Sequence, residues 1–161
     1  MFRELRRKKQ VLKKRDVVSI LENASSGILA VYGDNDYPYA VPLSYVYHND
    51  KIYFHSASSG HKIDAIKRNS KVSFTVVGQD EVVPEQFTTY YSSVIIFGKA
   101  NLVENSEEKM EALKTISRKY SPNLERQMEK EIESAFEKLT MISIDIDHMT
   151  GKEALELVKQ R

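Results

Sequence analysis

The sequence predicts a mainly β fold in which an antiparallel barrel, closed or split, is flanked by helices. Three observations support this prediction. Six segments rich in β-branched and aromatic residues are separated by turn signals, the periodicity becomes helical after residue 105, and a strand pattern returns near residue 139. With 161 residues, the chain is long enough for one domain with a substantial core.

A short helix and five strands come first. Asp16 is the expected N-cap of an amphipathic helix over "RDVVSILENAS". The strands follow as "GILAVYG", "YAVPLSYVY", "KIYFHSA", "KVSFTVV" and "YYSSVIIFGKANLV". The first three are close enough in sequence to be hairpin neighbours. Pro42 cannot donate a hydrogen bond to a neighbouring strand, which indicates a bulge, an edge or a place where the sheet opens.

Two further helices and a sixth strand complete the pattern. Asn105 and Glu108 have the spacing of a capping box and predict a helix over "EEKMEALKTISRKY". Pro122 predicts the first turn of the next helix, at about residues 122–138. The alternation in "LTMISIDID" predicts a strand with one buried face.

Basic residues are concentrated at the N-terminus. Of the 24 Lys and Arg residues, eight lie in residues 1–15 together with one Glu, so the other residues carry a net charge of −6. We therefore divide the chain into a basic arm, residues 1–15, and a single domain, residues 16–161. Such an arm can bind nucleic acid, but arms of this kind are commonly solubilising or packed across a partner subunit, so nucleic-acid binding is not the favoured role.

The composition also indicates the compartment. The absence of cysteine excludes disulfides, thiolate metal sites and a cysteine nucleophile. No apolar run is long enough to span a bilayer, and no apolar stretch follows the first basic residues as it would in a secretory signal. We therefore expect a cytoplasmic protein without a membrane partner.

The segment "FHSASSGHKIDAIKRN" places cations where a helix usually carries anions. If Ser59 is the N-cap, Gly60, His61 and Lys62 form the first turn, whose free N–H groups and dipole attract negative charge. A bound phosphate would balance these charges. A solvated helix start with Lys62 extended into water explains the segment equally well.

Other residues suggest chemistry only weakly. His55 lies in a strand beside apolar residues, where a structural histidine is more common than a catalytic one. Asp145 and Asp147 share one face of their strand while His148 points away, so no metal site is predicted. Motifs of serine hydrolases, metalloproteases and P-loop proteins do not occur.

Tyrosine is abundant in the strands. Most of the nine Tyr residues lie in "YPYAVPLSYVYHNDKIYF" and "TTYY". Such amphipathic rings are consistent with a wall for a flat heteroaromatic ligand. Strand propensity combined with interface packing accounts for them equally well.

The order of these segments resembles a known superfamily. "YPYAVPLSYVY", then "IYFHSA" followed by "GHK" and "KVSF", then "SVIIFGKA" resemble the pyridoxamine 5′-phosphate oxidase-like FMN-binding split-barrel proteins, especially the nitroimidazole-resistance (Nim-type) branch. The resemblance covers about residues 16–150. It implies a six-stranded antiparallel split β-barrel flanked by helices, and a homodimer with FMN at the subunit interface.

The resemblance also implies where FMN is held. Lys62 and His61 would bind the phosphate, the segment from Val41 to Tyr45 would follow the isoalloxazine, and His55 would lie near the ring as the candidate catalytic residue. His61 stands where relatives often carry Arg, and "DND" replaces the Gly usually found before "YPY". Ser92 and Ser93 would approach from the second subunit. The implied cofactor-binding residues are Val41, Pro42, Leu43, Ser44, Tyr45, His55, Ser56, Ala57, Gly60, His61, Lys62, Ser92 and Ser93.

The implied function is that of an FMN-dependent oxidoreductase. It would take electrons from a nicotinamide or another donor and reduce a small molecule such as a nitroimidazole or another nitroaromatic compound. The ending "TGKEALELVKQR" lacks the basic substrate motif of true pyridoxamine phosphate oxidases, which argues against oxidation of the B6 vitamer. Two alternatives are a non-enzymatic flavin- or haem-binding protein of the same superfamily, and a nucleic-acid-binding regulator that uses residues 1–15.

Overall fold

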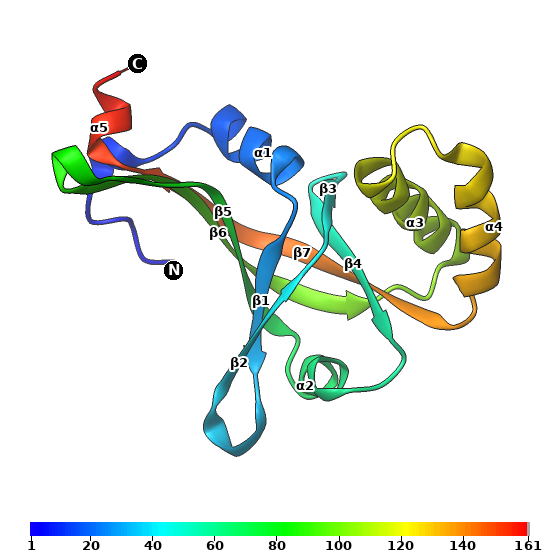
Figure 1. Cartoon of the computed structure of the whole chain (residues 1–161). Helices are drawn as coiled ribbons and strands as arrows, with labels where there is room; N and C mark the ends of the chain where they lie inside the picture. The colour runs from blue at the N-terminus through cyan, green and yellow to red at the C-terminus, as the bar shows by residue number, and fades with distance from the viewer. Residues whose placement is uncertain (161) are drawn as a thin grey trace.

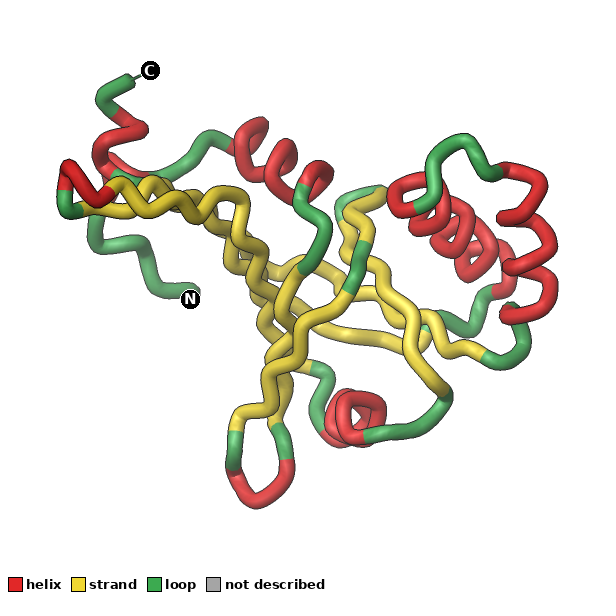
Figure 2. Tube along the Cα trace, viewed as in Figure 1, coloured by secondary structure: helices red, strands yellow, loops and turns green. Residues whose placement is uncertain are grey.

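Seven strands form one antiparallel sheet, with helices packed against it (Figures 1 and 2). The computed structural model describes residues 1–160, apart from the Glu125 side chain. The strands are β1 (Gly27–Tyr32), β2 (Pro38–Leu43), β3 (Val46–His48), β4 (Lys51–Ala57), β5 (Lys71–Val83), β6 (Thr88–Leu102) and β7 (Leu139–Glu153). The helices are α1 (Lys14–Asn23), α2 (His61–Arg68), α3 (Ser106–Tyr120), α4 (Glu125–Ala135) and α5 (Leu155–Val158), and short 3-10 turns are η1 (Lys8–Gln10), η2 (Asp34–Asp36) and η3 (Pro84–Gln86).

The described strands form a sheet with two open edges. Their order is β2–β1–β5–β6–β7–β4–β3, so β2 and β3 are the edge strands. The prediction of a mainly β split barrel is confirmed, but the strand count is seven rather than six. The extra strand arises because "YAVPLSYVY" divides after Leu43. As a result β2 pairs with β1 and β3 pairs with β4, which confirms the predicted hairpin neighbours, while the other neighbour of β4 is β7.

Tyr45 holds the chain at the point where β2 ends and β3 begins. Its side chain is fully buried, its hydroxyl donates to the Leu21 carbonyl at 2.7 Å, and its ring packs edge-on against Phe74 at 5.1 Å between centroids. The Tyr45 N–H donates to the Tyr120 hydroxyl at 2.9 Å, and Lys119 Nζ donates to the Tyr45 carbonyl at 3.1 Å. Every polar group of this residue therefore has a partner, although the chain leaves the sheet here.

Apolar side chains gather in two clusters on opposite sides of the sheet. The larger one lies between α1, α2 and the sheet, and it includes Leu21, Phe54 and Phe74. The smaller one lies between the sheet and helices α3 and α4. Because these helices cover the second face of β7, residues 141–144 are all buried. The prediction of a single buried face for this strand is therefore wrong over these four residues.

The predicted start is confirmed for helix α3, but not for α4 or α1. The capping box is confirmed at its first half, since the Asn105 side chain accepts a hydrogen bond from the Glu108 N–H at 2.9 Å. Helix α4 begins at Glu125 rather than at Pro122, because Asn123 adopts a left-handed conformation with φ of +65°. Helix α1 begins at Lys14 with Lys13 as its N-cap, so the prediction of Asp16 as N-cap is wrong.

Strands β5 and β6 continue beyond the barrel as a long hairpin (Figure 1). The register shifts between Val77 and Gln79, where a side chain on Gly78 would meet Ser92 Oγ at 2.7 Å. The N-terminal segment packs beside this hairpin on β7. The Leu12 N–H donates to the Gly151 carbonyl at 3.0 Å, and Gln10 Nε2 donates to the Glu153 carbonyl at 2.8 Å. The C-terminal part of the basic arm is therefore attached to the sheet.

Within residues 1–160 no helix combines the length and the apolar character that crossing a bilayer requires.

We expect Tyr45→Phe to lower the free energy of unfolding by about 1–2 kcal/mol, because the buried Leu21 carbonyl loses its partner. Urea denaturation followed by circular dichroism measures the change. The matched control is Tyr47→Phe, whose hydroxyl donates to Asp50 at the surface, and we expect a change below about 0.5 kcal/mol. Equal effects of the two substitutions would contradict the role assigned to Tyr45.

Candidate functional site

Strand β4 and helix α2 present most of the residues predicted to bind a phosphate. Strand alternation directs Phe54 and Ser56 into the barrel and leaves His55 and Ala57 on the open side. Ser56 is 6% exposed, yet its Oγ has no hydrogen-bond partner among the described residues. A buried hydroxyl without a partner is costly, so this atom is suited to a ligand that supplies one.

Helix α2 starts without a capping side chain in the described part of the chain. Its N-cap is Gly60, with φ of +128° and ψ of 168°, so the prediction of Ser59 as N-cap is wrong. This conformation is essentially restricted to glycine. His61 and Lys62 form the first turn as predicted, and Asp64 is the acidic residue of that turn. The first N–H groups of the helix remain available to an anion.

The His61 imidazole packs on an aromatic ring and lies near a carboxylate. Its ring stacks on Tyr39 of β2, with centroids 4.1 Å apart and planes inclined by 29°. Its Nε2 atom lies 3.7 Å from Asp34 Oδ2, which is too long for a hydrogen bond. Nε2 is buried and, among the described residues, has no hydrogen-bond partner. We call Ser56, Gly60, His61 and Lys62 the candidate phosphate site.

The pKa of His55 is influenced by Lys62 of the candidate phosphate site. Partial burial lowers the pKa of His55, and the nearby Lys62 charge lowers it further. A neutral imidazole at neutral pH can donate one hydrogen bond and accept another, or ligate a metal.

The segment from Val41 to Ser44 lies along an open edge of the sheet. Strand β2 is an edge strand, and Pro42 still faces Ile28 of β1 in the register. Backbone groups on the other edge are therefore accessible, and the prediction that Pro42 marks an edge is confirmed. Tyr45 differs from the other four residues of this predicted group. It is buried, and its backbone groups bond to Tyr120 and Lys119, so it supports the segment from within the core.

Ser92 and Ser93 lie away from helix α2 of the same chain. In the β6–β7 register they face Glu153 and Lys152, whereas the end of β6 nearest α2 is at Lys99, opposite Lys71. The six residue steps from Ser93 to Lys99 span about 20 Å at the rise of a strand. One chain therefore does not bring these serines to its own candidate phosphate site.

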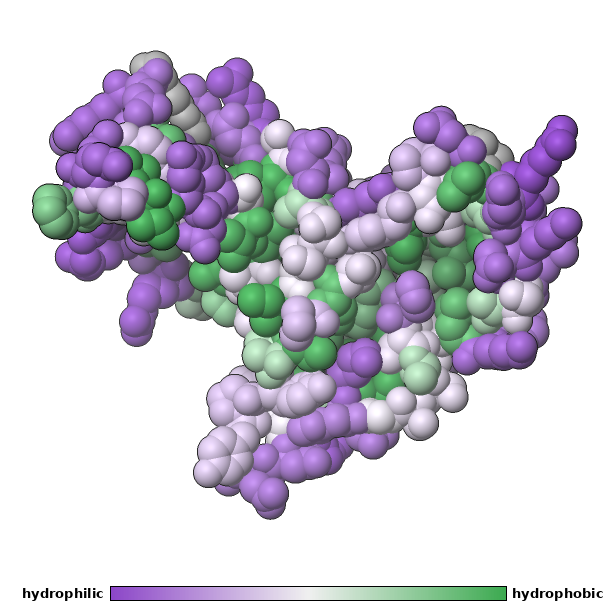
Figure 3. Space-filling view, viewed as in Figure 1, coloured by the Kyte–Doolittle hydropathy of each residue, from purple (hydrophilic) through white to green (hydrophobic). Residues whose placement is uncertain are grey.

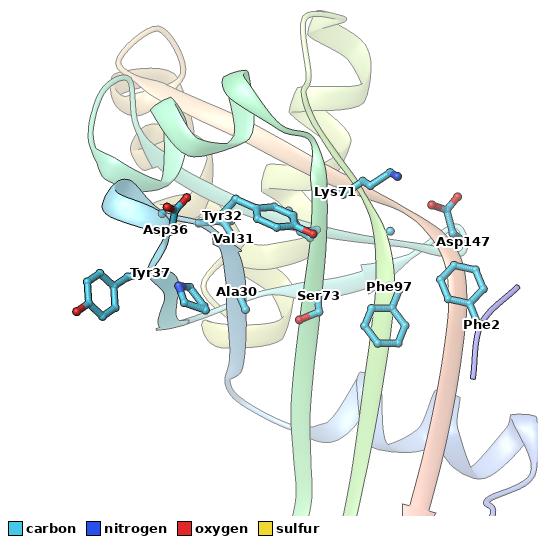
Figure 4. Close-up of a pocket in the computed structure, with 14 residues that line it drawn as sticks. Phe2, Ala30, Val31, Tyr32, Asp36, Tyr37, Lys71, Ser73, Phe97 and Asp147 are labelled. Atoms are coloured by element: carbon cyan, nitrogen blue, oxygen red, sulfur yellow. The ribbon is translucent and has the colours of Figure 1, made fainter. Parts of the chain in front are cut away.

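A second cavity was not predicted from the sequence. A pocket of about 620 Å³ lies between the β1–β2 hairpin and the outer surface of β5, β6 and β7 (Figure 4). Phe2 of the N-terminal arm stacks on Phe97 at 5.7 Å and on His148 at 4.6 Å between centroids. The lining residues are Phe2, Ala30, Val31, Tyr32, Gly33, Asp36, Tyr37, Pro38, Lys71, Val72, Ser73, Phe97, Gly98 and Asp147. The cluster of Tyr residues around "YGDNDYPY" was the sequence feature that could have indicated this pocket. The contribution of Phe2 could not be predicted, because it depends on tertiary contacts.

Residues that resembled a metal cluster serve other contacts. Asp145 pairs with Lys51 at 3.0 Å and accepts a hydrogen bond from Asn101 at 3.0 Å, while His148 stacks on Phe2. Within residues 1–160, no group of three or more His, Cys, Asp or Glu side chains is arranged to hold a metal ion.

We expect the His55 imidazole to titrate below pH 6.5, the ordinary midpoint of histidine, because burial and Lys62 both disfavour its charged form. NMR titration measures this midpoint, and the His55→Gln spectrum assigns the signal. Lys62→Met should raise the midpoint, whereas Lys67→Met on the same helix should not. An unchanged midpoint in Lys62→Met would contradict the proposed coupling.

A family model described as pyridoxamine 5′-phosphate oxidase matches residues 13–153. A search of curated proteins gives no significant match. Among solved structures, a putative 5-nitroimidazole antibiotic resistance protein from Bacteroides thetaiotaomicron is 27% identical, with a TM-score of 0.77 over 89% of this chain and 86% of that chain.

Two more distant structures share the fold. The flavocytochrome Anf3 from Azotobacter vinelandii is 21% identical, with a TM-score of 0.77 over 94% of this chain and 72% of that chain. The FAD and heme binding protein from Mycobacterium smegmatis is 16% identical, with a TM-score of 0.78 over 91% of this chain and 74% of that chain. These comparisons confirm the superfamily that the motifs predicted. The match over residues 13–153 shows that the chain belongs to the pyridoxamine 5′-phosphate oxidase family.

Proposed function

We propose that the chain binds FMN and passes electrons from a nicotinamide or another donor to small molecules, including nitroaromatic compounds. Three structural relatives support this proposal through their names, which describe 5-nitroimidazole antibiotic resistance, a flavocytochrome and FAD with heme binding. The redox chemistry would come from FMN when it is bound. The residues of the chain would bind it, orient it and control protonation beside it.

One observation carries the proposal. Two buried polar atoms, Ser56 Oγ and His61 Nε2, have no hydrogen-bond partner among the described residues, and both belong to the candidate phosphate site. Lys62 adds a positive charge and the first turn of α2 adds free N–H groups. A phosphate at this helix start would accept hydrogen bonds from these N–H groups and from Lys62. The residues present therefore fit a phosphorylated cofactor.

The remaining predicted residues fit the flat part of the same cofactor. The accessible backbone edge of β2 between Val41 and Leu43, with Ser44 directly after it, can bond to the polar edge of an isoalloxazine. Tyr45 would fix this segment from inside the core. His55, held neutral, would be positioned to donate or accept a proton near the ring or the substrate.

We also propose that a second copy of the chain completes the site. Exposed apolar side chains share the outer face of β1, β5 and β6, and we call them the outer apolar strip: Ile28, Val77, Ile95 and Phe97. Ser93 faces Val77 in the register and lies on the same face. Figure 3 shows hydrophobic residues in the middle of the face that it draws, between hydrophilic regions. A subunit packed on this strip would bury it and receive Ser93 at its interface.

We expect the purified protein to be yellow and to release FMN on denaturation. Lys62→Met should weaken FMN binding by about tenfold or more, because it removes a charge-assisted bond to the phosphate. Its effect on riboflavin, which lacks the phosphate, should be small. Fluorescence titration of the apoprotein measures both affinities, with Lys67→Met as the control. Unchanged FMN affinity in Lys62→Met would reject the proposed phosphate site.

We expect Ile95→Asp to convert a dimer into monomers and to reduce FMN retention, because it places a charge in the outer apolar strip. Analytical ultracentrifugation and the flavin-to-protein absorbance ratio measure the two effects. Leu124→Asp, an exposed apolar position next to α4, should change neither. A monomeric parent protein that retains FMN would refute the shared site.

A haem-binding alternative has its own support in His55. A neutral imidazole is the form that ligates iron, and the lowered pKa of His55 favours this form. A Soret band without released flavin would select this alternative. Anaerobic addition of NADH or NADPH to the yellow protein separates a reductase from a flavin carrier. Bleaching followed by reoxidation with a nitroaromatic compound supports the reductase, and persistent yellow colour with all donors supports the carrier.

A further inference from the structure

Asp34, in the turn between β1 and β2, contacts both ends of helix α2. Its Oδ1 atom accepts a hydrogen bond from Arg68 Nη2 at 2.7 Å, and its Oδ2 atom lies 3.7 Å from His61 Nε2. His61 and Arg68 are seven residues apart and therefore lie on one face of the helix. The Asp34 carboxylate therefore lies between Arg68 in the last turn of α2 and His61 in the first turn. Of these two residues, His61 belongs to the candidate phosphate site.

The turn that carries Asp34 is well defined by its backbone. The Gly33 N–H donates to the Tyr37 carbonyl at 3.0 Å, and the Tyr37 N–H donates to the Asp34 carbonyl at 3.1 Å. Asn35 and Asp36 both have positive φ angles, of 55° and 64°. A side chain at Gly33 would meet the Tyr37 carbonyl oxygen at 2.5 Å and His61 Nε2 at 3.3 Å, so glycine permits the turn to approach the helix. The Asp34 carboxylate is therefore held towards α2 by the fold.

This carboxylate is negatively charged at neutral pH. The hydrogen bond from Arg68 is the main cause that lowers the pKa of Asp34, and the charges of Arg68 and His61 lower it further. Arg68 is paired with Asp34 from the C-terminal end of α2. His61 is left between a fixed carboxylate and the position proposed for the phosphate.

We propose that Asp34 is a specificity-determining residue that weakens the binding of phosphorylated flavin at the first turn of α2. The proposal rests on the proposed function. The carboxylate lies beside the His61 imidazole, and it repels the phosphate. A fixed negative charge beside an anion site disfavours the anion. The chain would accordingly distinguish FMN from riboflavin less strongly than Lys62 and the helix terminus alone would allow.

A purely structural role for Asp34 predicts different behaviour. If Asp34 served only to tie the β1–β2 hairpin to α2, its loss would loosen Tyr39 and His61 and would weaken both flavins. Asparagine keeps the shape of the side chain and an oxygen that can accept from Arg68, but it removes the charge. Asp34→Asn therefore distinguishes an effect of the negative charge from an effect of the structural contact between the β1–β2 hairpin and α2.

The experiment is a fluorescence titration of apoprotein with FMN and with riboflavin at one ionic strength. We expect Asp34→Asn to lower the Kd for FMN by about three- to tenfold and to leave the Kd for riboflavin unchanged, because only FMN carries the phosphate. The matched control is Asp36→Asn, two residues further along the same turn, which should change neither Kd by more than about twofold. Thermal unfolding of each variant shows whether the hairpin remains in place.

Each other outcome counts against a stated claim. Unchanged or weaker FMN binding in Asp34→Asn, while the parent binds FMN and Lys62→Met weakens it, overturns the role of Asp34 and leaves the proposed function intact. Equal tightening for FMN and riboflavin, or an equal gain in Asp36→Asn, also overturns it, because the effect would then not be specific to the phosphate. Absence of FMN binding in the parent and all variants overturns the proposed function itself.

Discussion

The burial of Tyr45 is the constraint on which the arrangement of the sheet depends. At this residue the chain leaves one edge strand and begins the other, and a backbone that crosses between edges inside a protein must find partners outside the sheet. Leu21, Lys119 and Tyr120 supply them, so α1 and α3 are both tied to one point between β2 and β3. The two edges of the sheet are thereby fixed relative to each other, and the barrel stays split.

The split determines where a ligand can bind. Because β2 ends the sheet, its outer backbone edge remains unpaired, and Tyr39 on this strand reaches the first turn of α2. Strand β4, next to the other edge, delivers Ser56 and the start of α2. A closed barrel would have consumed the backbone groups of β2 in a ladder, and the candidate phosphate site would have lacked its neighbouring edge.

The sequence was sufficient for six strand segments, for a helix with His61 and Lys62 in its first turn and for the superfamily, because each of these depends on local pattern or on ordered motifs. It was insufficient where tertiary contacts override the pattern. The alternation in "YAVPLSYVY" continues through Tyr45, and Pro42 indicated a bulge, an edge or an opening without placing the break after Leu43. Residues 141–144 look half exposed until α3 and α4 cover them. Asp34 reads as an ordinary turn residue, since its meeting with His61 and Arg68 requires the fold.

The stacking of Phe2 on Phe97 has a practical consequence for anyone who produces this protein. Phe97 belongs to the outer apolar strip, so the first residues of the chain lie on the surface that a second subunit is proposed to cover. A purification tag fused ahead of Met1 would emerge directly onto that surface and crowd it. Tagged material would then be biased towards colourless, unassembled protein, and cleavage of the tag should come before any judgement of its cofactor content.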